Sequence, residues 1–160
     1  MNALARTVRA VGEFAAAART AEEFLDRTGA MILSGFETDE ISISFCDRVS
    51  GEVFQYASPP VAARSPVLVV ARDIAVHGFQ CGRADFRISS IAPAQQATTI
   101  EAIDAIVQQI AFFAERQTER SRQRLWHDQR SVNWSSAIAW LRSNAWPLSG
   151  VAREVAVNQR

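Results

Sequence analysis

Residues 41–58 read ISISFCDRVSGEVFQYAS and predict a β-hairpin. In the first half Ile41, Ile43 and Phe45 alternate with small polar residues, which is the period-two pattern of a strand with one buried face. The turn RVSGE follows, in which Gly51 tolerates a positive φ, and an extended pattern resumes at Val53. An antiparallel sheet that is buried on one side is therefore expected to begin here.

Two later segments extend this sheet. Residues 67–79, VLVVARDIAVHGF, are rich in β-branched residues, and a turn at Arg72 and Asp73 would divide them into two strands. Residues 80–90, QCGRADFRISS, alternate again, with Ala84, Phe86 and Ile88 on the buried face. Four or five antiparallel strands are predicted, and the opposite face is expected to carry Ser42, Ser44, Cys46, Cys81, Arg83, Asp85 and Arg87.

Helices flank the predicted sheet. An Ala-rich amphipathic helix is expected over residues 3–18, and Thr20 with Glu23 forms a capping box that opens a second helix. Pro93 is expected to close the sheet, and a second capping box of Thr98 and Glu101 to open the longest helix. The apolar stripe of that helix contains Ile103, Ile106, Ile110 and Phe113, and it thins after Glu115 to a charged continuation that keeps Leu125.

Length and composition limit the class of protein. A chain of 160 residues that is 48% hydrophobic fits one ordinary domain with a helical extension. Because its formal net charge is zero, the whole molecule has no net positive electrostatic field that would attract nucleic acid. Its two cysteines have no CxxC or Cys/His metal spacing, so a reducing cytoplasm is expected and no metal site is predicted. The early apolar residues are interrupted by charge and no later run reaches about 18 uncharged apolar residues, so no secretion signal or membrane span is expected.

The strand ending in Asp47, the turn with Gly51, the returning strand and the terminal helix segment IEAIDAIVQQIAFFAERQ resemble a GAF domain of bacterial signal-transduction proteins. The resemblance covers residues 20–117, preceded by a helix over 1–19 and followed by a helical extension over 118–160. It implies an α+β, PAS-related fold, with the terminal helices packed on one face of an antiparallel sheet. The host protein would be a sensor histidine kinase or a transcriptional regulator.

In that family the sheet face opposite the helices holds a small ligand or is left degenerate. The resemblance therefore implies an unknown small-molecule ligand rather than a resident cofactor. Only a short connection separates Tyr56 from Val67, so the usual helical roof of the pocket is expected to be reduced. The residues assigned to ligand binding are Ser42, Ser44, Cys46, His77, Cys81, Arg83, Asp85 and Arg87. A solvated face with Asp85 neutralising the arginines is the alternative for the last three.

The function expected from this resemblance is a cytoplasmic, non-catalytic sensory module that dimerises through its terminal helices and relays a change induced by a ligand or partner. The predicted homodimer interface consists of Ile103, Ile106, Ile110, Phe113 and Leu125. One alternative is a thiol redox enzyme resembling free methionine sulfoxide reductase, and another is a ligand-free dimerisation platform. His127, followed by Asp128 and Arg130, resembles the phosphoacceptor box of histidine kinases, although no ATP-binding module follows it.

Overall fold

The computed structural model describes residues 3–36, 38–60, 67–89 and 91–144. The order of elements is α1 (Ala3–Ala17), α2 (Ala21–Gly35), β1 (Glu40–Cys46), β2 (Val53–Ala57), β3 (Val67–Val76), β4 (Phe79–Ser89) and α3 (Pro93–Asn144). The chain divides into a first unit, Met1–Ser121, and a second unit, Arg122–Arg160. The α+β class and the antiparallel sheet predicted from the sequence are confirmed.

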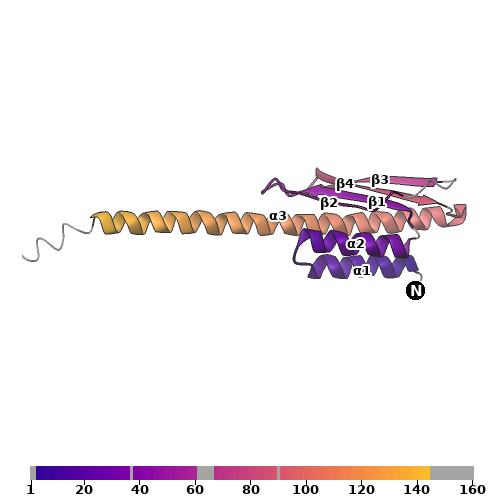
Figure 1. The fold of residues 1–160 in the computed structure, drawn as a ribbon, viewed down its shortest axis with the longest axis horizontal. Coiled ribbons are helices and arrows are strands. Elements are labelled where there is room, and N and C mark those ends of the chain that lie inside the picture. Colours follow the sequence, from indigo (N-terminus) through magenta and orange to yellow (C-terminus); the bar gives the residue numbers. More distant parts are fainter. Residues whose placement is uncertain (1–2, 37, 61–66, 90, 145–160) are drawn as a thin grey trace, which may run out of the picture. The chain divides into compact units, whose positions relative to one another are not determined.

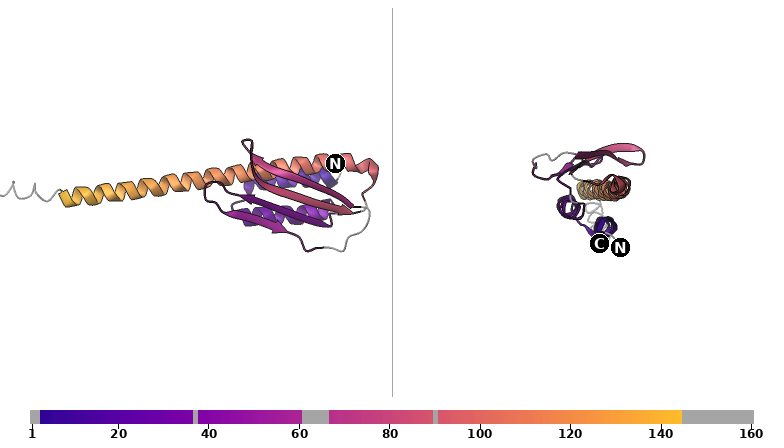
Figure 2. Two further views of the ribbon diagram at one scale, coloured as in Figure 1. Left: turned by 90° about the horizontal axis from the view of Figure 1, so that it is seen from above. Right: turned by 90° about the vertical axis from the view of Figure 1, so that its right-hand side faces the viewer.

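The first unit is built in layers on one side of a four-stranded antiparallel sheet with strand order β2-β1-β4-β3. Figure 1 and the end view in Figure 2 show α2 and the first part of α3 against the sheet, with α1 packed behind them. The core joins these layers, and among its fully buried side chains are Phe24 of α2, Phe45 of β1 and Phe113 of α3. The Phe24 and Phe113 rings stack with their centroids 4.0 Å apart.

Strand alternation follows the expected pattern over most of the sheet. Ile41, Ile43 and Phe45 of β1 are at most 1% exposed. The predicted partners on β4 are also in the core: Ala84, Phe86 and Ile88. The two central strands therefore present one apolar face to the helices, as period-two spacing requires.

Local signals at chain reversals explain several element ends. The Thr20 hydroxyl accepts a hydrogen bond from the Glu23 backbone N–H at 3.2 Å, which caps α2 as predicted. Gly51 has a φ of 75° in the β1–β2 turn, a conformation that costs glycine little. The hairpin over residues 41–58 therefore forms where the sequence indicates.

Two element boundaries differ from the prediction. Strand β3 runs without a break through Arg72 and Asp73, and the chain reverses instead at His77 and Gly78, so the sheet has four strands. Helix α3 begins at Pro93 rather than at Thr98. Proline is well suited to the first helical position because the N–H that it lacks would have no partner within the helix.

Candidate functional site

The outer face of the sheet carries most of the predicted ligand-binding residues. Ser44 of β1 lies opposite Gln55 of β2 and Arg83 of β4, and Arg83 in turn lies opposite Asp73 of β3. One row further along, Ser42 pairs with Ala57 and Asp85. Helices α1 and α2 and the part of α3 that belongs to the first unit lie on the other side of this sheet (Figure 2). The structure thus brings Ser42, Ser44, Arg83, Asp85 and Arg87 together on one partly exposed surface.

Both arginines of this face already have carboxylate partners. Arg83 Nε donates to Asp85 Oδ1 at 2.9 Å, and Arg87 Nη1 lies 3.2 Å from Glu40 Oε2. The hydrogen bond to Asp85 raises the pKa of Arg83 above its ordinary value. An anionic ligand on this face would have to compete with Asp85 and Glu40, which agrees with the predicted alternative of a solvated, internally neutralised face.

The two cysteines occupy different environments. Cys46, on β1 beside Val53 of β2, is partly exposed, and its Sγ donates weakly to the Asp47 carbonyl oxygen at 3.6 Å. Cys81 lies where the β3–β4 register shifts, because Ile74 pairs with Gly82 but Ala75 pairs with Gln80. Such a bulge redirects side chains.

As a result, Cys81 packs against the core, and its Sγ lies 3.4 Å from the Ile74 carbonyl oxygen. The bulge interrupts the alternation from which the outer-face position of Cys81 was predicted, so its place beside Arg83 stays a prediction. Burial raises the pKa of the Cys81 thiol, with a smaller contribution of the same sign from Cys46. The raised pKa decreases the thiolate fraction at neutral pH, which weakens Cys81 as a nucleophile.

His77 lies in the β3–β4 turn rather than on the outer face. Its φ of 51° places it in the left-handed region that the turn requires. Its Nε2 lies 3.0 Å from Glu115 Oε1 of α3, so the side chain contacts the helix layer. The structure therefore separates His77 from the other predicted ligand-binding residues.

The predicted dimer residues divide into two groups. Ile103, Ile106, Ile110 and Phe113 are 0% exposed because they fill the core between α3 and the sheet of the same chain. Their assignment to a dimer interface is wrong: the apolar stripe of α3 is covered within one chain. Leu125, in the second unit, is 47% exposed and remains available.

The second unit is described as helix up to Asn144. Every side chain described from Arg122 onward is exposed, and among them are the large apolar residues Leu125, Trp126, Trp134 and Ile138. His127 also lies on this exposed helix. A helix with no packed face gains little from tertiary contacts, so these apolar side chains are the main candidates to bind a partner.

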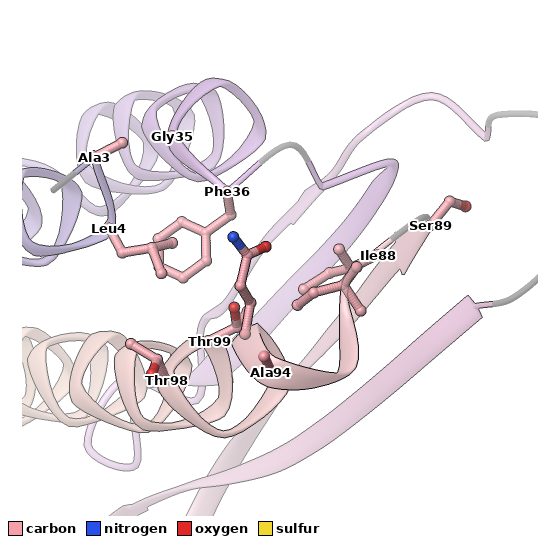
Figure 3. A pocket seen from close by; sticks show the side chains of 11 residues that line it. Ala3, Leu4, Gly35, Phe36, Ile88, Ser89, Ala94, Thr98 and Thr99 are labelled. Carbon is pink, nitrogen blue, oxygen red and sulfur yellow. The ribbon is translucent and has the colours of Figure 1, made fainter.

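The first unit also contains a hollow that the sequence did not indicate (Figure 3). It has a volume of about 430 Å³ and lies between the start of α1, the end of α2, the end of β4 and the first turns of α3. Leu4, Phe36 and Ile88 give it apolar walls, and Thr98 and Thr99 add hydroxyl groups. The predicted start of the helix at Thr98 left out the turn that begins at Pro93. That turn forms one side of the hollow, so the sequence pattern did not indicate it.

No group of three or more His, Cys, Asp and Glu side chains in the described part of the chain is arranged to hold a metal ion. Likewise, none of the described helices combines the length and the apolar character that crossing a membrane demands.

The arrangement of a central antiparallel sheet with helices on one face defines a GAF-like fold. The structure is similar to the crystal structure of the GAF domain of A. Aeolicus nlh2 in an inactive state, with a TM-score of 0.54 and 11% sequence identity. The match covers 72% of this chain and 97% of that domain. No protein-family model and no curated protein matches the sequence. At this identity the similarity demonstrates the shared fold and nothing finer.

Proposed function

We propose that this chain is a non-catalytic, GAF-like sensory module that forms a homodimer through the second unit and relays a change induced by a ligand or partner along α3. The observation that carries the proposal is the continuity of α3 from the core of the first unit into a helix whose apolar side chains are exposed. A bacterial signalling protein, including a sensor histidine kinase with His127 as phosphoacceptor, is the proposed context.

Dimerisation is assigned to the exposed apolar residues of the second unit instead of the buried stripe. Trp134 and Ile138 are four residues apart, so they project from neighbouring positions on one side of the helix. Trp134 is 71% exposed. Covering such side chains in a second copy of the helix would remove apolar area from water, which favours association.

Light scattering on the full chain tests the dimer. The wild type is expected at twice the chain mass of 17.6 kDa at high micromolar concentration. The double variant Trp134→Arg, Ile138→Arg should shift to the monomer mass, whereas Ser135→Arg, a control at an exposed polar position of the same helix, should not. A wild type that stays monomeric throughout would defeat the homodimer proposal.

The ligand is assigned to the outer sheet face, which corresponds to the ligand side of the fold that the chain resembles. Ser42 and Ser44 supply hydroxyl groups, and the pairs Arg83–Asp85 and Arg87–Glu40 supply charge at its edge. Native mass spectrometry of protein purified directly from cells would reveal a retained small molecule. A retained mass that is lost in the variant Ser44→Phe would support this site, and retention of the same mass in that variant would exclude it.

A further inference from the structure

Within the first unit, the buried apolar stripe of α3 ends several residues before Ser121, the last residue of that unit. Phe113 is 0% and Ala114 is 2% exposed, but each residue from Glu115 to Ser121 is partly or fully exposed. Side chains in this stretch make polar contacts with other parts of the first unit. We call four of these residues the clasp: Glu115, Arg116, Arg120 and Ser121.

Two residues of the clasp bind the end of α1 and the connection that follows it. Arg116 Nη1 donates to the carbonyl oxygens of Ala15 and Ala16, each at 2.7 Å. Arg120 Nη1 donates to the carbonyl oxygen of Arg19, in the connection that follows α1, at 3.1 Å. The last carbonyls of a helix lack partners within the helix and carry partial negative charge, so guanidinium groups stabilise them.

The other two residues of the clasp bind turns of the sheet. Glu115 contacts His77 in the β3–β4 turn at 3.0 Å. The Ser121 hydroxyl donates to a carboxylate oxygen of Asp47, which follows β1 and is 1% exposed. The other oxygen of Asp47 accepts from the Val49 N–H at 2.9 Å, so this carboxylate joins α3 to the β1–β2 turn.

The clasp differs physically from the core that precedes it. A hydrogen bond typically contributes less than a fully buried apolar side chain does, and the stripe of α3 that precedes the clasp is secured by several such buried side chains. Segments with few buried apolar contacts open at a lower free-energy cost than the core. A helical turn that loses its packing is only marginally stable in water and frays.

We propose that the clasp releases from and returns to the first unit as one local unit while the core up to Ala114 stays folded, and that the hydrogen bond between Ser121 and Asp47 is its principal latch. This inference refines the relay proposed above and depends on that relay for its functional consequence. In the closed state, α1 and two turns of the sheet hold residues 115–121. In the released state, α3 is held only through its apolar stripe.

Hydrogen exchange measured by mass spectrometry on the full chain tests the clasp. The variant Ser121→Ala removes the donor and keeps a good helix former, so the domain is expected to stay folded. Exchange in peptides over residues 115–124 and in the β1–β2 turn should accelerate roughly tenfold or more, because hydrogen bonds to a charged acceptor are among the stronger ones. Peptides over residues 103–113 should exchange as in the wild type.

The matched control is Ser135→Ala, the same substitution at an exposed position of the same helix. It should leave exchange unchanged over residues 103–124. Unchanged exchange over 115–124 in Ser121→Ala would overturn the proposal, and so would equal acceleration over 103–113, since either result would mean that the clasp is not a separate unit latched at Ser121. These outcomes do not depend on oligomeric state or ligand. A monomeric wild type would therefore contradict the proposed relay but would leave the proposal about the clasp unchanged.

Discussion

The ring of Tyr56 on β2 lies directly over Gly29 of α2, in the space that a Cβ atom at position 29 would occupy. This contact lets α2 approach the edge of the sheet closely. Glycine in a helix interior normally costs stability relative to alanine. Its presence at position 29 is therefore explained by packing rather than by backbone conformation.

We expect Gly29→Ala to destabilise the domain by about 1–3 kcal/mol, because overpacking outweighs the gain in helix propensity. Urea denaturation would measure the change. Gly12→Ala is the matched control, since the atoms nearest to its added Cβ belong to the flexible side chain of Gln109, the first of them at 3.3 Å. That control should be neutral or stabilising by up to about 1 kcal/mol. A Gly29→Ala variant as stable as the control would contradict the close packing.

Asp47 should make stability depend on acid pH. Burial alone raises the pKa of Asp47, but hydrogen bonds from Ser121, Val49 and Ser50 outweigh it and hold the pKa below its ordinary value of 3.8. A carboxyl whose pKa is lowered by folding contributes stability that is complete above its unfolded pKa and is lost as pH falls through the folded one.

Asp47→Asn should therefore be less stable than the wild type at neutral pH, by about 1–3 kcal/mol. The difference should shrink as pH falls below 3.8. Urea midpoints measured along an acid series would follow it, and a difference that stays constant down to the lowest pH would show that the Asp47 charge does not stabilise the fold.

Arg116 should stabilise the end of α1. Its two hydrogen bonds to Ala15 and Ala16 engage carbonyls at a helix C-terminus, so we expect Arg116→Gln to lower the free energy of unfolding by about 1–2 kcal/mol. Arg9→Gln offers a control, because Arg9 forms an exposed ion pair with Glu13 within α1. Thermal denaturation should show less than about 0.5 kcal/mol for that control. Equal effects of the two substitutions would argue against a specific role of Arg116.

The Cys81 thiol should be slow to react. In a Cys46→Ser variant, Cys81 is the remaining thiol, and its pKa is raised above the ordinary value of 9.0, chiefly by burial. Alkylation by iodoacetamide at neutral pH should be several-fold slower than for the same chain unfolded in urea, because the thiolate fraction is smaller and access is reduced. Faster alkylation in the folded state would contradict this expectation and would favour the alternative of a thiol redox enzyme.

Much of the candidate site followed from local pattern. The period-two alternation placed Ser42, Ser44, Arg83, Asp85 and Arg87 on the face away from the helices, and the register of the sheet agrees. The alternation is interrupted at Cys81, where a bulge shifts the register. A bulge depends on how two strands meet and leaves no signal in the spacing of one strand.

The sequence alone determined the α+β class, the hairpin over residues 41–58, the cap at Thr20 and the apolar stripe of α3, because each depends on propensities and periodicities within a few neighbouring residues. Tertiary structure alone decided what covers that stripe: it is the sheet of the same chain, so Ile103 and Ile110 belong to the core and not to an interface. It also decided the contact between Asp47 and Ser121, which are 74 residues apart in sequence. A hydrogen bond across that separation exists only once the sheet and the helix have packed, and no local pattern encodes which distant partner the folded chain will bring within reach.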